Sequence, residues 1–424
     1  MLQNSSSHSL AQLSAASEED PVSQSGWIPL TLALTPSQLA AQIAEYEGFI
    51  WLDSATAEPG SYSYLTAQPS FLLSGHIDQD WSKVVEALEN GQTQGTTGGL
   101  FGWVNFDGLF QLGHYPAVLK YDHASSSWFE TGHFDLPKSG FISPAPSITS
   151  LPFEPLVSRQ EFVSRVKAAQ HYITAGDIYQ VNLSYPWLAH WAKEASILAV
   201  YERLRQISPA PFAAYLTQAG TTIFSASPEL FLKMSGRNIT TRPIKGTRPR
   251  FSDDLHRDAQ SARDLLACDK ERAELLMITD LERNDLGQVC EFGSVQTPDL
   301  WRVECFAQVY HLVSTVTGTL RPEINHAHAF RACFPGGSIS GAPKKRALEI
   351  ISELETHPRG LYTGAIGYFG FDGTSQWNIA IRTAVKHKDQ ICFHVGSGIV
   401  ADSIPEREWE ETLHKASGLL KAWS

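Results

Sequence analysis

The spacing of apolar residues changes several times along this chain of 424 residues, and each change marks a different element. Ser158 and Glu161 match a capping box, in which two side chains satisfy backbone amides at the start of a helix. The apolar residues that follow recur at helical spacing as far as Gly176, a natural stop: Phe162, Val166, Ala169, Tyr172 and Ile173. Segment 178–184 then alternates apolar and polar residues. This stretch predicts a helix followed directly by a strand.

The same patterns predict the other elements of the chain. Further helices are expected at 39–46, 81–90, 197–207, 253–283, 342–355 and 406–422. Further strands are expected at 49–52, 98–104, 212–217, 222–226, 229–234, 310–319, 364–371, 377–385 and 391–395. Because many strands follow one another as in hairpins, the chain predicts an α+β fold, a layered sandwich of largely antiparallel sheets flanked by helices.

The chain divides into three parts. Residues 1–25 are polar and lack periodic apolar positions, so we expect a disordered tail. Residues 26–150 contain short aromatic and glycine-rich strands and form the N-terminal region. Segment 135–156 contains five prolines and several serines, which is typical of a crossover between two parts. Residues 156–424 then form the second, larger domain.

Composition excludes several classes of protein. A net charge of −12 argues against general binding of nucleic acid. No apolar run approaches the length of about 18 residues that a membrane span needs. The start of the chain lacks the basic and apolar blocks of a signal peptide, and the five cysteines are scattered without a CxxC pair. These features indicate a cytoplasmic protein without a zinc site.

Lys245 is the first candidate for chemistry. It lies among Arg242, Arg248 and Arg250, and Pro243 and Gly246 bound the segment. A lysine near other cations, or one that is desolvated, loses proton affinity and becomes a nucleophile. The alternative from these residues alone is a basic surface turn that offsets an acidic chain.

Two glutamate pairs are the second candidate. Glu271 and Glu274 lie three residues apart on one predicted helix, and Glu408 and Glu411 do so on another. Residues at this spacing share a helix face, and two such faces could offer carboxylate oxygens to Mg²⁺. Solvated acidic helix faces are the alternative.

Other polar positions add to these candidates. A glycine-rich turn at 334–341 leads into a helix whose free amides would attract anions, although it could be a tight structural turn. Glu229 precedes an apolar run, where burial would raise its pKa and suit a general acid; it could equally cap a turn. Residues 280–285 form a dense polar cluster. His311 lies in a strand-like run, where a core role is the ordinary alternative.

Taken together, these segments resemble the chorismate-utilising enzymes: anthranilate, aminodeoxychorismate, isochorismate and salicylate synthases. The matching stretches are GDIYQVNLS (176–184), SASPELFL (225–232), RPIKGTRPR (242–250), ELLMITDLERNDLG (274–287), VYHLVSTVTG (309–318), FPGGSISGAPKKRALEIISELE (334–355), YTGAIGYFGFDG (362–373), NIAIRT (378–383) and VGSGIVADSIPEREWEET (395–412). The N-terminal region resembles anthranilate synthase component I more loosely, through WLDSA (51–55), SYSYLTAQP (61–69) and GGLFGWVNFD (98–107).

Within that family, the PIKGT form around Lys245 resembles the aminodeoxychorismate synthase branch, component I, whereas anthranilate synthases carry alanine there. The resemblance implies that Lys245 attacks C2 of chorismate as the C4 hydroxyl leaves and that Glu229 protonates this hydroxyl. Ammonia then attacks C4 and expels the lysine, which gives 4-amino-4-deoxychorismate. Covalent catalysis of this kind divides one difficult substitution into two easier ones.

The resemblance also implies the surroundings of the substrate. Mg²⁺ would lie among four carboxylates, some binding directly and some through water: Glu271, Glu274, Glu408 and Glu411. Tyr362 and Arg382 fall at positions that bind the pyruvyl carboxylate, and the backbone around Gly398 helps to hold substrate. Ser338, a threonine in many anthranilate synthases, and His311 line the site near the ring.

The family implies partners as well. A separate glutamine amidotransferase subunit, component II, would supply ammonia, since the chain contains no nucleophilic-cysteine motif of such a domain. A separate lyase would then release 4-aminobenzoate for folate synthesis.

Three alternatives stay open on the sequence. They are anthranilate synthase component I, an isochorismate or salicylate synthase that uses water as nucleophile, and a non-catalytic chorismate-binding regulator. Residues 52–55 depart from the LLES-type motif of feedback-inhibited relatives, so regulation by tryptophan is not expected.

Overall fold

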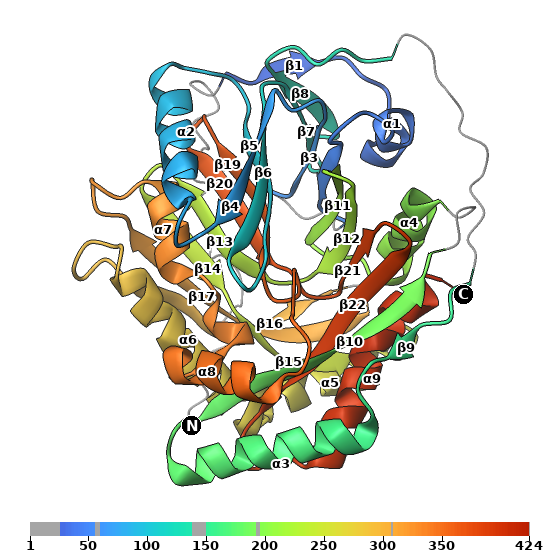
Figure 1. The fold of residues 1–424 in the computed structure, drawn as a ribbon, viewed down its shortest axis with the longest axis vertical. Coiled ribbons are helices and arrows are strands. Elements are labelled where there is room, and N and C mark those ends of the chain that lie inside the picture. Colours follow the sequence, from blue (N-terminus) through green and yellow to red (C-terminus); the bar gives the residue numbers. More distant parts are fainter. Residues whose placement is uncertain (1–25, 56–59, 138–149, 192–195, 307, 424) are drawn as a thin grey trace, which may run out of the picture.

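The structure is a computed structural model that describes residues 26–55, 60–137, 150–191, 196–306 and 308–423. Two large sheets form the middle of the molecule, and helices lie around them (Figure 1). Every pair of strands in the described part of the chain is antiparallel: β1 with β8, β2 with β3, and so on through both sheets. The predicted α+β sandwich of largely antiparallel sheets is confirmed. The predicted tail at 1–25 lies outside the described residues.

Sheet A contains twelve strands from both halves of the chain. Its order is β1 (Ile28–Leu30), β8 (Ser127–Thr131), β7 (Val118–Asp122), β3 (Tyr62–Thr66), β2 (Ile50–Asp53), β11 (Phe212–Gln218), β12 (Thr221–Ser227), β21 (Thr383–His387), β22 (Gln390–Ile399), β10 (Gln180–His190) and β18 (Gly341–Ala342), with β9 (Glu154–Pro155) beside β10.

Sheet B contains ten strands and is also shared between the two halves. Its order is β15 (Ile244–Pro249), β17 (Val309–Thr319), β14 (Asn238–Arg242), β13 (Leu230–Ser235), β20 (Thr374–Ile379), β19 (Ala365–Gly370), β5 (Gly99–Val104), β6 (Leu109–Tyr115) and β4 (Phe71–His76), with β16 (Gln296–Cys305) beside β17. Strands of region 26–150 therefore complete both sheets of the larger domain.

The helices pack on the outer face of one sheet or the other. Those on sheet A are α1 (Pro36–Ile43), α3 (Arg159–Ala175), α4 (Ile197–Ile207), α8 (Lys344–Leu354) and α9 (Pro405–Lys421). Those on sheet B are α2 (Trp81–Thr93), α5 (Leu255–Ala267), α6 (Asp269–Gly287) and α7 (His326–Cys333). A short 3-10 turn, η1 (Gly337–Ile339), precedes α8. No helix in the described ranges is long and apolar enough to cross a membrane.

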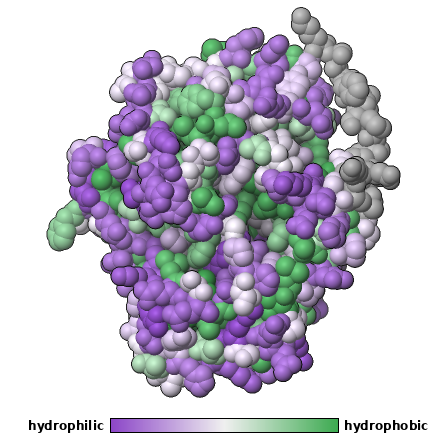
Figure 2. All heavy atoms as spheres, viewed as in Figure 1, coloured by the Kyte–Doolittle hydropathy of each residue, from purple (hydrophilic) through white to green (hydrophobic). Residues whose placement is uncertain are grey.

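Apolar side chains fill three layers. One cluster lies between the sheets and combines Ile50 and Leu52 of β2 with Phe101 of β5 and Ile366 of β19. Of two larger clusters, one lies between sheet A and its helices and the other lies between sheet B and its helices. Burial of each large side chain contributes about 1.5–3 kcal/mol, so these layers hold the two sheets in a fixed relation. Figure 2 shows hydrophilic residues predominating on the surface, with hydrophobic residues in smaller patches between them.

Most predicted elements around the site are present, with three corrections. The helix expected at 253–283 is two helices, because Cys268 between them is extended (φ −75°, ψ 102°). The strand expected at 377–385 is divided into β20 and β21, because Arg382 has a left-handed backbone (φ 50°). The helix expected from 342 begins at Lys344, because β18 pairs with β10 instead. Residues at or near the three corrections, Lys270, Arg382 and Ile339, line the cavity described below.

Candidate active site

One cavity of about 670 Å³ is lined by all eleven residues that the sequence analysis assigned to the reaction, the substrate or the metal, whereas the polar cluster at 280–285 is not part of its lining. It lies where the β15 and β17 end of sheet B approaches β22 of sheet A, and α6 and α9 also contribute to its wall. Its lining includes Glu229, Lys245, Glu271, Glu274, His311, Ser338, Tyr362, Arg382, Gly398, Glu408 and Glu411. These positions are far apart in the sequence, and only the folding of both sheets brings them together.

Lys245 reaches into this cavity from β15. Its Nζ donates a hydrogen bond to the Ser338 carbonyl oxygen at 3.3 Å. Burial lowers the pKa of Lys245, while Glu274 and Glu229 act in the opposite direction. No carboxylate of the described residues forms an ion pair with its ammonium group. A lysine in these surroundings gives up its proton more readily than a solvated one and can act as a nucleophile.

The arginines near Lys245 have a different role from the one expected. Arg242 pairs with Glu304, Arg248 with Glu271 at 2.7 Å, and Arg250 with Asp258 at 3.1 Å. Their charges are balanced by these acids. The pKa of Lys245 is therefore lowered mainly by burial, which is one of the two causes that the sequence analysis offered, and to a smaller extent by Lys415; the neighbouring arginines do not contribute.

Glu229 is buried beside Lys245, with 5% of its surface exposed. Its backbone is held by Ile379 N, which donates to the Glu229 carbonyl at 3.1 Å. Burial raises the pKa of Glu229, and the Ser338 hydroxyl and the Lys245 ammonium oppose that change. A carboxyl group that keeps its proton near a reacting centre suits a general acid, as the sequence predicted for its pKa.

The four predicted metal-binding glutamates line one side of the cavity but do not form a closed cage. Glu271 pairs with Arg248, Glu411 pairs with Lys415 at 2.7 Å, and Glu408 accepts a hydrogen bond from the Ser397 hydroxyl. Burial raises the pKa of Glu274, and Glu271 and Glu411 add to this effect. Within the described ranges, no three His, Cys, Asp or Glu side chains lie close enough to hold a metal ion.

This donor set still fits Mg²⁺ in one respect. Magnesium prefers oxygen ligands and is usually held by one or two carboxylates together with waters and substrate oxygens. Several carboxylates around one cavity, with mutual repulsion that raises the pKa of Glu274, offer such a partial site. A cation would relieve that repulsion.

Two other lining residues, Arg382 and Tyr362, suit an anionic substrate. Arg382 lies between β20 and β21, and its guanidinium has no carboxylate partner among the residues that the structure describes. The planar guanidinium matches a carboxylate in two-point contact. Tyr362 stacks on His394 with ring centroids 5.5 Å apart, and its hydroxyl lies 2.7 Å from where a Cβ at Gly396 would be. Glycine at 396 therefore leaves room for this hydroxyl.

His311 is neutral in this site. Burial, together with the nearby Arg382 charge, lowers the pKa of His311 to about 4. Its Nδ1 lies 3.1 Å from the Thr247 hydroxyl. The imidazole can therefore donate or accept a hydrogen bond at neutral pH, but it does not add positive charge beside Lys245.

Among the polar residues that sequence reasoning missed, three line the cavity and Gln180 lies beside it, with its Nε2 3.3 Å from where a Cβ at Gly398 would be. Lys415 donates to the Gly396 carbonyl at 3.0 Å, and it follows Glu411 by one helical turn. The side-chain amide of Gln180, the Asn182 amide nitrogen and His394 Nε2 are buried and lack hydrogen-bond partners in the described part of the chain. Gln180 and Asn182 share one face of β10, since residues two apart in a strand point the same way. This alternation along the predicted strand was the signal in the sequence that could have identified Gln180 and Asn182.

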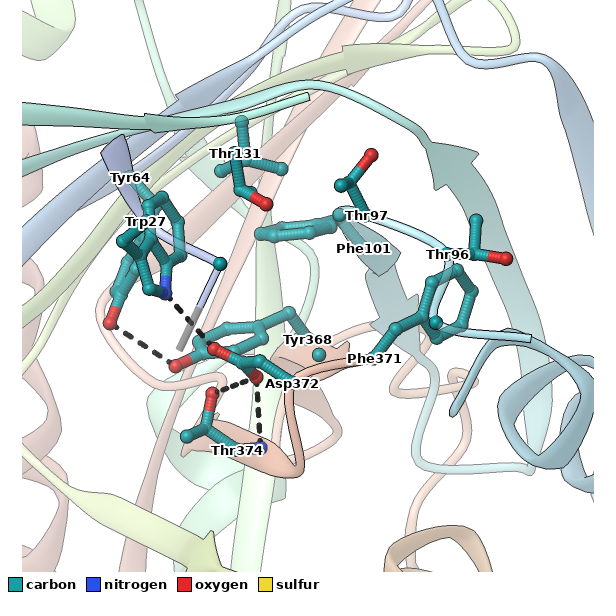
Figure 3. A pocket seen from close by; sticks show the side chains of 15 residues that line it. Trp27, Tyr64, Thr96, Thr97, Phe101, Thr131, Tyr368, Phe371, Asp372 and Thr374 are labelled. Atoms are coloured by element: carbon teal, nitrogen blue, oxygen red, sulfur yellow. Dashed lines mark hydrogen bonds between the residues drawn. The ribbon is translucent and has the colours of Figure 1, made fainter. Parts of the chain in front are cut away.

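A smaller cavity of about 270 Å³ lies elsewhere between the sheets (Figure 3). Its walls include Trp27, Tyr64, Phe101 and Tyr368, and Asp372 accepts a hydrogen bond from the Trp27 indole at 3.1 Å. No lysine, arginine or second carboxylate is among its lining residues in the described ranges. It therefore lacks the reactive groups that meet in the larger cavity.

Comparisons with known proteins show which family and which relatives this chain resembles. A family model for chorismate binding enzymes matches residues 93–421. The chain is 46% identical over 270 residues to an anthranilate synthase component 1 of Haloarcula marismortui, which covers 64% of this chain and 55% of that protein. It is 44% identical over 264 residues to aminodeoxychorismate synthase component 1 of Salmonella typhimurium, which covers 62% of this chain and 58% of that protein.

A solved structure extends the likeness to the whole fold. Anthranilate synthase component I from Streptococcus pneumoniae TIGR4 has a TM-score of 0.75 and 28% identity, covering 86% of this chain and 93% of that chain. The chain spans little more than half the length of the two sequence relatives. Those relatives carry two different activity names at nearly equal identity, so overall similarity does not separate the two reactions.

Proposed function

This chain belongs to the family of chorismate binding enzymes, and on that premise we propose that it aminates chorismate at C4 as aminodeoxychorismate synthase component I. The product is 4-amino-4-deoxychorismate, a precursor of 4-aminobenzoate and folate. The observation that carries this proposal is Lys245. Its amine lies in the cavity with a lowered pKa, beside the buried Glu229.

The proposed reaction begins at Lys245. Its neutral amine forms a bond to C2 of the ring, the two ring double bonds shift to C1–C6 and C4–C5, and the C4–O bond breaks. Glu229 gives its proton to the departing hydroxyl, which leaves as water. The raised pKa of Glu229 and the lowered pKa of Lys245 support these assignments, because each favours the protonation state that the step requires.

Ammonia completes the exchange. It attacks C4 as the C2–N bond to Lys245 breaks, so that the lysine leaves as a neutral amine. The new C4 ammonium group then passes one proton to the Glu229 carboxylate, which restores the starting acid. The sum is chorismate and ammonia giving 4-amino-4-deoxychorismate and water.

Other residues of the cavity would bind and orient the substrate. Arg382 and Tyr362 would hold the pyruvyl carboxylate, and the backbone at Gly398, where a Cβ would lie 3.7 Å from Lys245 Nζ, would leave space for the ring. Ser338 and His311 would contact the ring beside the reacting atoms. Mg²⁺ held by several of the four glutamates would supply positive charge to the ring carboxylate: Glu271, Glu274, Glu408 and Glu411.

The nitrogen source and the later step are also part of the proposal. The relatives are named as component 1 of their synthases, which supports a second subunit that releases ammonia from glutamine. A separate lyase would convert the product to 4-aminobenzoate and pyruvate.

Anthranilate synthase is the second candidate, because relatives of that name match the chain at similar identity. Incubation with chorismate, Mg²⁺ and an ammonium salt distinguishes the two. We expect no anthranilate fluorescence, and 4-aminobenzoate only after a lyase is added. Anthranilate formed without a lyase would support the second candidate. Failure to consume chorismate with ammonium present would instead point to a non-catalytic binding protein.

A further inference from the structure

Ser338 contacts both proposed reacting residues from a tight turn at residues 336–340, here called the Ser338 turn. Its carbonyl accepts a hydrogen bond from Lys245 at 3.3 Å, and its hydroxyl lies near enough to Glu229 to oppose the rise in the pKa of that carboxyl group. The position of this turn therefore affects the proposed nucleophile and the proposed acid together. Two buried ionisable side chains outside the cavity, Glu282 and Arg359, hold its two ends.

Glu282 holds the first end from α6. Its side chain is 3% exposed, and its Oε1 accepts a hydrogen bond from Gly337 N at 3.0 Å. The turn rests directly on the helix, since a Cβ at Gly337 would lie 2.7 Å from Leu281 Cδ2 and 3.1 Å from Glu282 Oε1. Glycine at 337 permits this close approach of the turn to α6. The hydrogen bond to the Glu282 carboxyl group fixes the orientation of the Gly337 N–H.

Arg359 holds the other end. Its side chain is 2% exposed and donates to the Ile339 carbonyl at 3.2 Å and to the Asn182 carbonyl at 2.6 Å. The guanidinium also donates to both oxygens of Glu355, at 2.8 and 2.9 Å, and to the Thr363 hydroxyl at 3.1 Å. Because all these contacts use one rigid planar group, the Ile339 carbonyl is tied to β10.

We infer that Glu282 and Arg359 are positioning residues that clamp the Ser338 turn and so place Ser338 between Lys245 and Glu229. Neither side chain lines the cavity, so both act through the turn. This inference rests on the proposed function, because the reacting pair is assigned there. A displacement of about 1 Å at a catalytic group can cost on the order of 100-fold in rate, so loss of the clamp should reduce turnover.

The charges around Glu282 indicate which substitution preserves the clamp. Burial, then Asp285 of the same helix, raises the pKa of Glu282 to about 8, and Lys344 of α8 opposes them. Glu229 adds to the increase from the far side of the turn, and the Cys333 thiol of α7 also lies near. At neutral pH the group is then mainly a carboxylic acid. Glutamine has the same shape and keeps an acceptor for Gly337 N.

The test compares three substitutions in the full chain, with kinetics followed as consumption of chorismate in the presence of ammonium. Glu282→Leu removes the acceptor, and Gly337→Ala lifts the turn from α6 while Glu282 is intact. Each should lower kcat by about 10- to 100-fold with KM changed less than about 3-fold, since the loss falls on the reacting groups. Glu282→Gln should stay within about 3-fold of wild type.

A matched control and a direct probe of the turn complete the experiment. Asp280→Leu changes an exposed carboxylate of the same helix, whose ion-pair partner among the described residues is Arg283 at 2.8 Å, and should leave kcat unchanged. Hydrogen exchange of a peptide covering the Ser338 turn should accelerate about 10-fold or more in Glu282→Leu, with α9 unaffected. If Glu282→Leu did not fold, Gly337→Ala and Glu282→Gln would carry the test.

The outcomes separate the two proposals. A faster-exchanging turn with unchanged kcat would overturn the positioning role, and so would an equal loss in Glu282→Gln and Glu282→Leu. Unchanged exchange in Glu282→Leu would overturn the clamp itself. If wild type consumed chorismate without amination at C4, the proposed function would fail, but the comparison of kcat among variants would still decide the clamp.

Discussion

Substitution of Gly246 by alanine perturbs the site where its backbone lies against Glu271. Gly246 follows Lys245 and has a left-handed backbone, with φ +73°. A Cβ there would overlap Oε2 of Glu271 and would lie 2.8 Å from Leu265 Cδ1. Positive φ costs a residue with a Cβ about 1–2 kcal/mol, and overpacking adds about 1–3 kcal/mol. We therefore expect Gly246→Ala to lower the free energy of unfolding by about 2–5 kcal/mol.

A matched variant separates the strain from the overlap. Gly176 has a similar backbone, with φ +83°, and nothing lies within 4 Å of a Cβ built there. Gly176→Ala should therefore lose only the strain, about 1–2 kcal/mol, and should keep its activity. Urea unfolding at equilibrium measures both variants, and the difference between them isolates the overlap with Glu271.

The same substitution should affect catalysis. Because the overlap displaces Glu271 from the wall beside Lys245, we expect kcat/KM for amination to fall about 100-fold in Gly246→Ala. Equal losses of stability in the two variants, together with activity in Gly246→Ala within about 3-fold of wild type, would refute the reasoning. The close approach of Glu271 to this turn would then be unimportant for the reaction.

Three further predictions concern single groups of the site. Glu229→Gln removes the proposed general acid and should lower kcat by about 10²- to 10⁴-fold with little change in KM, which steady-state amination kinetics would reveal. Chelation of divalent cations should abolish amination, and Glu274→Gln should raise the Mg²⁺ concentration needed for half-maximal rate; a rate unaffected by chelation would contradict the metal assignment. Burial lowers the pKa of His311 to about 4 and of His394 to about 3. Between those values and about 6.5 the unfolded chain binds protons that the folded chain does not, so stability should fall as the pH is lowered from about 6.5 to 4, by up to about 1.4 kcal/mol per pH unit for each histidine. Urea midpoints against pH measure this slope, and His394→Gln should reduce it; an unchanged slope would show that His394 titrates normally.

The periodic segments of the sequence predicted the helices and strands that they form. Boundaries that depend on tertiary contacts were not predicted. The capping box at Ser158 and Glu161 predicted the start of α3, because its hydrogen bonds are local. The division at Cys268 and the left-handed backbone at Arg382 depend on tertiary structure, and no local sequence pattern marks them.

The same distinction holds for the site. The predicted residues meet in one cavity, since family resemblance transfers positions in three dimensions that spacing alone cannot. The electrostatic surroundings of Lys245 could not be predicted, because the arginines beside it are balanced by Glu304, Glu271 and Asp258 from other elements. The sequence marked residues 280–285 as a polar cluster, but the roles of Glu282 and Arg359 could not be predicted, because they depend on which backbone groups the two side chains reach.

Mass spectrometry of the protein with chorismate and Mg²⁺, but without ammonia, tests the central claim most directly. The account predicts a substrate-derived adduct, with loss of water from chorismate, that peptide mapping places on Lys245. Addition of an ammonium salt should then discharge the adduct, and Lys245→Ala should never form it. Full amination activity in Lys245→Ala would contradict the covalent mechanism.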